Sequence, residues 1–272
     1  MTRHRTVLAV SRMLFLFAGA APLAACGTNL KPHIERMEGC AVEVVTAGTG
    51  GPSVVFEAGF GNDWAPWDRV ASEVALHARV FAYSRPGYGA SDPTSTPRDA
   101  GHIVEELRAL LRAGGHAPPY LLVGHSFGGT YMELFARLHP EEVSGLVLVD
   151  PRHADFSTAC AEAHIDGCGI PDGAVKSLSR VEQDEYHQFP LTSGAIRAAG
   201  PFGSYPVRVL TATSHGLSQA GETLWVSMLA SLASEAPDGR QVLFPGADHN
   251  LEHNHATEVA QAILALAAAA HD

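Results

Sequence analysis

The sequence is poor in basic residues. Its 272 residues include 18 Lys and Arg against 29 Asp and Glu, a formal net charge of −11 with histidine counted as neutral. No cluster of Lys and Arg beyond the first residues reverses this balance. Because such a surface would repel phosphates, the composition disfavours nucleic acid as a partner. The hydrophobic content of 46% instead indicates a packed globular protein.

The start of the sequence lacks a hydrophobic run long enough for a comfortable membrane span. Arg3 and Arg5 precede an apolar stretch over residues 13–25, a pattern typical of a signal peptide. We therefore expect residues 1–25 to be removed on export. Residues 26–35 should then form a polar linker, and residues 36–272 one domain.

Cysteine is also scarce, with four in the whole chain. Cys26 directly follows Leu23, Ala24 and Ala25, an arrangement that resembles the lipobox of bacterial lipoproteins. This resemblance implies that Cys26 is lipidated and anchors the protein to a membrane, facing the periplasm or the cell exterior. The alternative is an ordinary secretory signal, in which Cys26 has no such role.

The other three cysteines suit an oxidising compartment. Cys160 and Cys168 lie in one short insert, so we expect a disulfide between them, although three thiols allow three single bridges. Cys40 would then remain unpaired and buried at the start of a strand. No Cys-x-x-Cys pair accompanies these thiols, and we expect neither a metal nor a cofactor. The oligomeric state stays open.

Apolar runs of strand length alternate with helical patterns along the rest of the chain. This alternation predicts an α/β fold, and the continuous Val and Leu runs indicate a mostly parallel central sheet covered by helices on both faces. The predicted strands cover residues 41–46, 53–57, 80–84, 120–124, 146–149, 207–210 and 241–244, and the predicted helices residues 70–77, 102–113, 130–138 and 257–269.

The pattern changes over residues 152–205. This stretch is rich in His, Asp, Gly and Ser, and its helical signal is weak. It follows a core strand, where an insert above a site would be placed. We therefore predict a small cap there.

Ser126 is the predicted nucleophile. It lies in the segment Gly124-His125-Ser126-Phe127-Gly128, between a predicted strand and a predicted helix, which is the context of a G-x-S-x-G nucleophile elbow. The tight turn requires the flanking glycines and raises the hydroxyl above the sheet. The helix N-terminus and the backbone N–H of Phe127 would then stabilise an oxyanion.

A second oxyanion donor should come from the loop after an earlier strand. Gly59 and Gly61 in that loop allow the backbone to approach a substrate closely, so we expect the N–H of Phe60 to be this donor. The alternative is a plain glycine turn without a role in chemistry.

A serine hydroxyl needs a base, and we expect it in the loop after the last strand. His249 lies in that loop, whereas His253 and His255 are expected to be surface residues on the approach to the final helix. His125 lies inside the elbow but should point away from the nucleophile and have a structural role.

The acid that orients the base is harder to predict. No carboxylate directly follows the strand at residues 207–210. Asp150 ends the strand at residues 146–149, and an acid at this strand tip can reach the histidine and stabilise its cation. Asp150 is therefore favoured, with Glu222 and Asp238 as alternatives.

Together these motifs resemble the bacterial α/β-hydrolase-fold esterases and lipases. The resemblance implies the order Ser126, Asp150, His249 for nucleophile, acid and base. This sequence departs from the family pattern in two places. Ser84 stands where the family usually has Asp, and no Asp follows the strand at residues 207–210, which supports Asp150. The matching segments are residues 56–61, 84–92, 122–129, 145–151 and 248–249, and the resemblance extends from about Cys40 to the end of the chain.

The resemblance implies a serine hydrolase that cleaves a small-molecule ester or a lipid through an acyl-enzyme. Dehalogenases and epoxide hydrolases of this fold attack with Asp, so a serine at the elbow argues against both. Lipase, acyltransferase, peptidase and carbon–carbon hydrolase activities use the same three residues and remain open. A binding protein that keeps the fold without catalysis is the alternative from another class.

Overall fold

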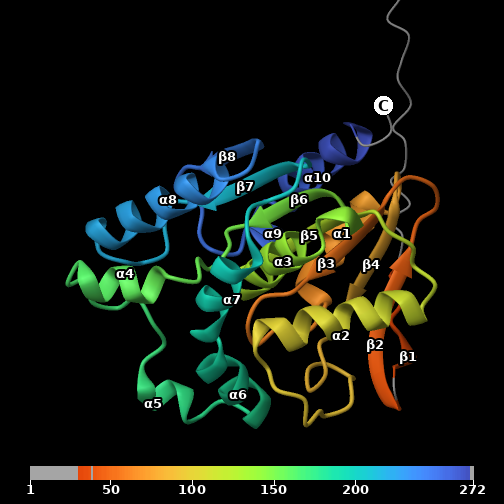
Figure 1. The fold of residues 1–272 in the computed structure, drawn as a ribbon, viewed down its shortest axis with the longest axis horizontal. Coiled ribbons are helices and arrows are strands. Elements are labelled where there is room, and N and C mark those ends of the chain that lie inside the picture. The colour runs from red at the N-terminus through yellow and green to blue at the C-terminus, as the bar shows by residue number, and fades with distance from the viewer. Residues whose placement is uncertain (1–29, 38, 270–272) are drawn as a thin grey trace, which may run out of the picture.

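An eight-stranded sheet forms the centre of the computed structural model, which describes residues 30–37 and 39–269 (Figure 1). The strands follow the order β1-β2-β4-β3-β5-β6-β7-β8. The pairs β1–β2 and β2–β4 are antiparallel, and all the pairs from β4 to β8 are parallel. The strands are β1 (His33–Met37), β2 (Cys40–Ala47), β3 (Ser53–Glu57), β4 (Arg79–Tyr83), β5 (Tyr120–His125), β6 (Val143–Val149), β7 (Pro206–Ala212) and β8 (Asp238–Phe244).

Helices cover both faces of the sheet and bury its apolar strands (Figure 1). On one face lie α2 (Ala100–Ala113), α3 (Phe127–Leu138) and α8 (Gln219–Ser234). On the other lie α1 (Asp68–Val74) and α10 (Ala256–Ala269), and the short α9 (Leu251–Asn254) contacts both of them. Two 3-10 turns, Ala65–Trp67 and Pro140–Glu142, complete the frame. The predicted α/β class with a mostly parallel sheet is therefore confirmed.

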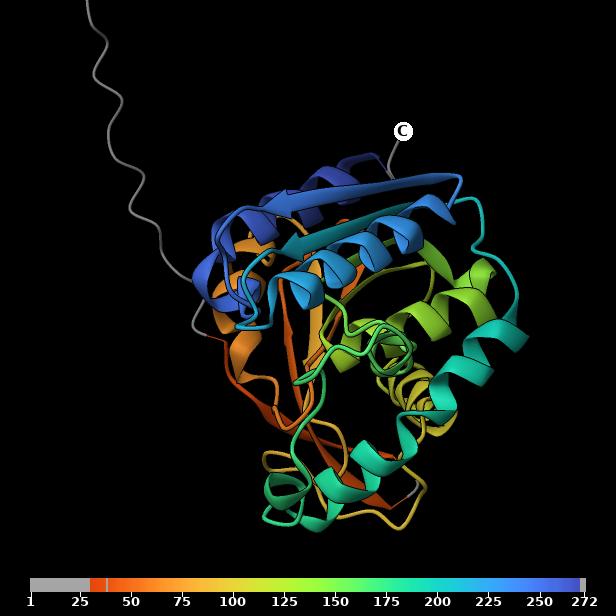
Figure 2. The same cartoon turned by 90° about the vertical axis from the view of Figure 1, so that its left-hand side faces the viewer.

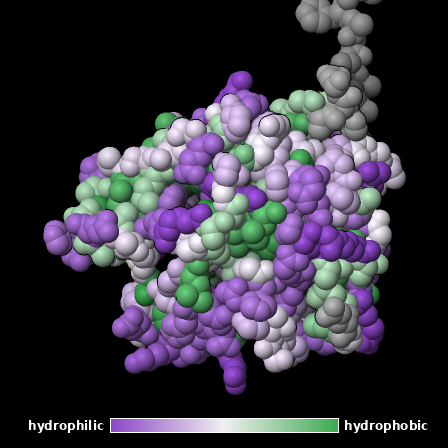
Figure 3. Space-filling view, viewed as in Figure 1, coloured by the Kyte–Doolittle hydropathy of each residue, from purple (hydrophilic) through white to green (hydrophobic). Residues whose placement is uncertain are grey.

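Burial explains why β5 is a strand. All six of its residues, Tyr120–His125, are buried, because α3 covers one face and α10 the other. Hydrophilic side chains dominate the face of the molecule seen in Figure 3, and strongly hydrophobic residues gather near its middle, with further hydrophobic residues toward its left side. None of the helices in residues 30–37 and 39–269 has the length and apolarity needed to cross a membrane.

Four helices fill the segment between β6 and β7. They are α4 (Phe156–Glu162), α5 (Asp172–Val175), α6 (Arg180–Gln188) and α7 (Leu191–Ala199). In Figures 1 and 2 they form an arm beside the sheet, with α5 and α6 farthest from β7 and β8. This segment coincides with the stretch predicted to be a cap, but it is more helical than its sequence indicates.

The N-terminal predictions fall largely outside the described residues. The expected signal peptide and Cys26 are not among them. The predicted linker over residues 26–35 extends too far, because residues 33–35 belong to β1. This edge strand pairs antiparallel with β2, and its polar residues conceal it in the sequence.

Candidate active site

Ser126 lies on a strained turn between β5 and α3. Its backbone has a φ of 53°, a left-handed conformation that non-glycine residues rarely adopt. The flanking glycines are sterically required: a Cβ on Gly124 would lie 2.4 Å from the carbonyl oxygen of Gly128, and one on Gly128 would lie 2.4 Å from that of Ala58. The sharp turn presents the Ser126 side chain to a cavity instead of the sheet.

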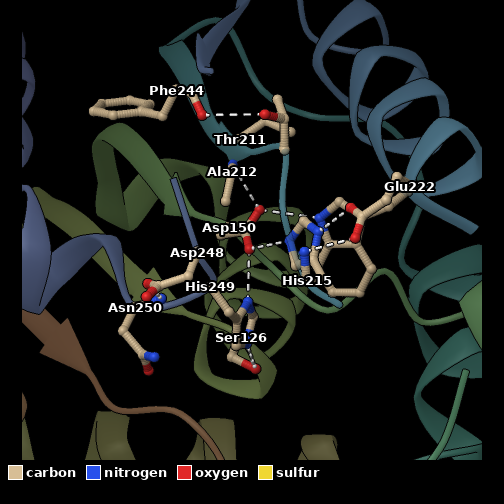
Figure 4. Close-up of polar contacts among 12 residues, drawn as sticks. Ser126, Asp150, Thr211, Ala212, His215, Glu222, Phe244, Asp248, His249 and Asn250 are labelled. Atoms are coloured by element: carbon tan, nitrogen blue, oxygen red, sulfur yellow. Dashed lines mark hydrogen bonds and ion pairs between the residues drawn. The ribbon is translucent and has the colours of Figure 1, made fainter. Parts of the chain in front are cut away.

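His249 lies in the loop after β8 and faces Ser126 (Figure 4). Its Nε2 is 2.8 Å from Ser126 Oγ, and its Nδ1 is 2.6 Å from Asp150 Oδ2. Because Nδ1–H donates to the carboxylate, Nε2 is left as the acceptor for the serine hydroxyl proton. This is the arrangement that a base requires in order to activate a serine.

Asp150 is the acid that reaches His249. It directly follows β6, has a φ of 42° and is fully buried. Its Oδ1 accepts hydrogen bonds from the Ala212 N–H and Trp225 Nε1–H, both at 3.0 Å, and its Oδ2 faces His215 and His249. Burial alone would raise the pKa of Asp150, but the hydrogen bonds and charges of the two histidines outweigh it and hold the pKa below its usual value.

The two alternative acids lie elsewhere. Glu222, on α8, binds the ring and backbone of His215 instead of His249. Asp238 is at the start of β8, where its carboxylate pairs with Arg208. Of the three acids considered, the structure therefore brings only Asp150 to His249.

His215 is a second histidine at Asp150. Its Nε2 is 2.7 Å from Asp150 Oδ2, and its Nδ1 is 2.7 Å from Glu222 Oε2 (Figure 4). Since both ring nitrogens face carboxylate oxygens, both have to carry protons to donate, which makes His215 a cation. Burial opposes this charge, but the hydrogen bonds and charges of Asp150 and Glu222 outweigh it and raise the pKa of His215.

Asp150, His215 and His249 also form the one group among the described residues whose spacing could suit a metal ion. In the observed arrangement, however, the ring nitrogens nearest Asp150 both donate protons to it. A metal would need lone pairs at these nitrogens, and binding it would break the contact that orients His249. The expected absence of a metal stays a prediction.

The predicted oxyanion donors lie beside Ser126. Phe127 is the first residue of α3, and Phe60 lines the same cavity as Ser126. A Cβ on Gly59 would lie 2.9 Å from His125 Nδ1 and 3.3 Å from Ser126 Cβ, so glycine lets the loop approach the elbow this closely. Among the described residues, the N–H groups of Phe60 and Phe127 donate to no acceptor, which leaves both free for a substrate oxygen.

Arg85 fixes the loop that carries Phe60. Its guanidinium donates to the carbonyl oxygens of Ala58 and Gly59, at 2.7 and 2.9 Å. It is fully buried between Glu57 and Glu185, with contacts of 2.7 and 3.1 Å. Because Glu185 lies on α6, the same arginine connects this loop to the cap.

The cavity above Ser126 has a volume of about 370 Å³. The cap contributes one wall, including Cys168, whose predicted disulfide with Cys160 is confirmed. Cys40 is free and partly buried at the start of β2. The cavity is lined by Phe60, Ser126, Phe127, Arg152, Gly167, Cys168, Gly169, Ile170, Tyr186, His215, Leu217, Trp225 and His249.

The other histidines near the elbow lie apart from the serine. His125 is buried, and its Nε2 donates to the carbonyl oxygen of His249 at 2.9 Å. Burial lowers the pKa of His125 to about 3, so its ring is neutral and holds the loop that carries His249. His253 is exposed, and His255 contacts Glu258.

Ser84, the first departure from the family pattern, keeps a structural hydrogen bond. Its hydroxyl donates to Glu43 at 2.7 Å and accepts from the Trp64 N–H at 3.2 Å.

Sequence reasoning missed His215 and Trp225 at Asp150, and Arg152 in the cavity. The only signal for Arg152 was its place two residues after the predicted acid.

Comparisons with known proteins agree with this architecture. A family model described as the alpha/beta hydrolase fold matches residues 52–164. The uncharacterized protein YqjL of Bacillus subtilis is 28% identical over 222 residues, which are 80% of this chain and 85% of YqjL. The pimeloyl-[acyl-carrier protein] methyl ester esterase of Klebsiella pneumoniae is 28% identical over 145 residues, 53% of this chain and 51% of that enzyme.

Solved structures show the same fold at low identity. The epoxide hydrolase VrEH1 from Vigna radiata superposes with a TM-score of 0.67 at 15% identity, covering 87% of this chain and 97% of VrEH1. The chain therefore has the α/β-hydrolase fold, the fold that its motifs predicted.

Proposed function

We propose that this chain is a serine hydrolase that cleaves carboxylic esters through an acyl-enzyme. The observation that carries the proposal is the contact of 2.8 Å between Ser126 Oγ and His249 Nε2, on an elbow that opens into a cavity. Asp150 is the proposed orienting acid, and the N–H groups of Phe60 and Phe127 are the proposed oxyanion hole.

In the acylation step, Ser126 Oγ attacks the ester carbonyl carbon while its proton passes to His249 Nε2. The carbonyl oxygen becomes an oxyanion, which the two N–H groups and the N-terminus of α3 stabilise. The buried carboxylate of Asp150 stabilises the imidazolium of His249. When the tetrahedral intermediate collapses, the alcohol oxygen takes the proton from Nε2, and the acyl group stays on Ser126.

In the deacylation step, a water molecule replaces the alcohol. His249 Nε2 takes one proton from the water, and the resulting oxygen attacks the acyl carbon. The bond between the acyl carbon and Ser126 Oγ then breaks, and Ser126 Oγ recovers the proton from His249 Nε2. The products are a carboxylic acid, an alcohol and the original enzyme.

The size of the cavity favours small esters over long-chain lipids. Its volume of about 370 Å³ is near the lower end of ordinary ligand pockets, and aromatic rings of Phe60, Tyr186 and Trp225 line it. We therefore expect short acyl chains to be preferred. A preference for long chains would instead support the lipase alternative.

A panel of p-nitrophenyl esters from acetate to palmitate tests this proposal. We expect the highest kcat/KM for short chains, and a loss of about 10⁴-fold or more in Ser126→Ala. Arg180→Gln is a matched control, because Arg180 is exposed on α6. No turnover of any ester by the folded wild-type protein would support the binding-protein alternative.

We further propose export and lipid anchoring through Cys26, which lies outside the described residues. The basis is the basic start, the short apolar stretch and the small residues before Cys26. Metabolic labelling with a fatty acid should mark the wild-type chain but not Cys26→Ala. An unlabelled wild-type chain would contradict the lipoprotein proposal and leave the esterase proposal untouched.

A further inference from the structure

Arg152 brings a guanidinium into the cavity that contains Ser126. It follows Asp150 by two residues, and its backbone N–H donates to the carbonyl oxygen of Ser126 at 2.9 Å. Its side chain lines the same cavity as Ser126 and His249. The position of Arg152 relative to the nucleophile is therefore set by the backbone of the elbow itself.

Only part of the guanidinium is used to hold it in place. Nη2 donates to the carbonyl oxygen of Cys168 at 2.6 Å and to Ser157 Oγ at 2.7 Å. The guanidinium carbon lies 4.7 Å from the ring centre of Phe156 and 5.8 Å from that of Trp225. Nε and Nη1 donate to no group among the described residues, so these donors remain for a ligand.

The charge of Arg152 is also uncompensated within the described part of the chain. Arg152 is partly buried, and two buried arginines nearby in the fold each pair with two carboxylates, Arg85 with Glu57 and Glu185, and Arg137 with Glu133 and Glu235. Arg152 forms no such ion pair in residues 30–37 and 39–269. Removing part of an unpaired charge from water costs free energy, which an anionic partner would recover.

The cavity itself offers no anion to Arg152. None of the described residues that line it carries a carboxylate, although the protein has a net charge of −11. The nearby Asp150 is committed through both oxygens to four donors. Burial lowers the pKa of Arg152 to about 10, a value that still leaves it charged at neutral pH.

We propose that Arg152 binds a carboxylate of the substrate, and that the preferred substrates are half-esters of small dicarboxylic acids. This inference rests on the proposed ester hydrolysis and names its substrate class. The free Nε–H and Nη1–H groups donate charge-assisted hydrogen bonds to the second carboxylate. The apolar walls accept the carbon chain between that carboxylate and the ester at Ser126.

A matched pair of esters tests the proposal. Monoethyl adipate and ethyl hexanoate have acyl chains of similar length, and only the first ends in a carboxylate. We expect wild-type kcat/KM to favour monoethyl adipate, with release of ethanol as the measurement. In Arg152→Gln, the ratio of the two kcat/KM values should fall about 10- to 100-fold, as expected for a lost hydrogen bond to a charged group.

Two further variants separate charge from packing. Arg152→Lys keeps the positive charge and should retain part of the preference. Arg180→Gln removes an exposed arginine of α6 and should leave the ratio unchanged. An equal fall for both esters in Arg152→Gln would overturn the proposal, because it would show that Arg152 only supports the Cys168 loop.

The result also distinguishes this inference from the proposed function. If wild type cleaves both esters equally well, the role of Arg152 is wrong and ester hydrolysis stands. If wild type cleaves neither ester and does not react with a fluorophosphonate, both proposals fail. Competitive inhibition by adipate but not by hexanoate in wild type, and its loss in Arg152→Gln, would support the carboxylate site directly.

Discussion

Asp150 offers two oxygens to four donors, and two of these donors are histidines that face the same oxygen. At the scale of single residues, the arrangement separates two roles. In the proposed mechanism Asp150 and His249 act on Ser126, whereas His215 and Glu222 hold Asp150 from its other side. The same carboxylate is therefore both a partner of the base and the centre of a buried charge network.

We predict that Asp150→Asn lowers kcat by about 10²–10⁴-fold, because the amide disfavours the correct tautomer of His249. Glu222→Gln should cost much less, since Glu222 accepts hydrogen bonds from His215 and from the Leu217 N–H and does not contact His249. Asp238→Asn should have no measurable effect, because Asp238 pairs with Arg208 at the start of β8. Steady-state kinetics on a short ester measures all three. A larger loss in either of the other variants than in Asp150→Asn would overturn the assignment.

The charge of His215 has a separate consequence. His215→Gln keeps a hydrogen-bond donor near Asp150 but removes the positive charge. Protonated His249 then faces a less compensated carboxylate, so the acid limb of the kcat/KM profile should move about 0.5–1 pH unit higher. His253→Gln changes an exposed histidine of α9 and serves as the control. If the acid limb of the kcat/KM profile lies at the same pH in His215→Gln as in wild type, His215 is neutral in the wild-type protein.

The meeting of three candidate site residues was predictable because each follows a recognisable strand. Ser126, Asp150 and His249 come directly or almost directly after predicted strands, whose carboxyl ends meet at one edge of the sheet. His215 and Arg152 carry no such signal, because their partners are fixed only by tertiary structure. Glu222 was an alternative because it is the next acid along the chain after the strand at residues 207–210, but it reaches the other histidine.

At the scale of elements, the cap depends on α6. Glu185 on this helix is fully buried and contacts Arg85, Tyr88 and Tyr131 from the main domain, at 3.1, 2.9 and 3.1 Å. A capping box between Ser179 and Glu182 begins the helix. The helix is polar in sequence, so its stability depends on these contacts more than on an apolar face. This is why the sequence signal for the cap was weak.

We predict that Glu185→Ala destabilises the protein by about 3–5 kcal/mol, because it breaks a buried ion pair and leaves Arg85 with one partner fewer. Asp184→Asn is the matched control on the same helix. Asp184 is exposed and pairs with Arg180 at the surface, so its loss should cost less than about 1 kcal/mol. Urea unfolding measures both free energies, and equal values would contradict the role of Glu185.

The core strands were predictable because each is a continuous apolar run. β3 was predicted with its observed bounds, residues 53–57, and β5 differs by one residue at its end. The edge strand β1 was missed, since its exposed residues show no apolar run. Packing on both faces leaves a clear pattern in a sequence, whereas backbone pairing at an edge does not.

At the scale of the whole molecule, stability should depend on the pH through buried acids. Glu252, on α9, is 2% exposed, and burial raises its pKa to about 7. An acid whose folded-state pKa is raised contributes stability that is present below its unfolded pKa and is lost as the pH rises through the folded value. The loss from Glu252 therefore occurs between about pH 4.5 and pH 7.

We predict that Glu252→Gln is more stable than wild type at pH 8, by about 2–3 kcal/mol, with little difference at pH 5. Thermal unfolding at the two pH values measures this change. Glu258→Gln, an exposed acid on α10, should show no such pH dependence. A stability difference between Glu252→Gln and wild type that is the same at both pH values would contradict a buried acid with a raised pKa.

The central claim is that Ser126 is a nucleophile activated by His249, and covalent labelling tests it most directly. A fluorophosphonate probe should react with the wild-type protein at one site, and mass spectrometry of the digested protein should place the adduct on Ser126. The label should be absent in Ser126→Ala and slowed strongly in His249→Ala. A folded wild-type protein that stays unlabelled, or an adduct on any other residue, would contradict the claim.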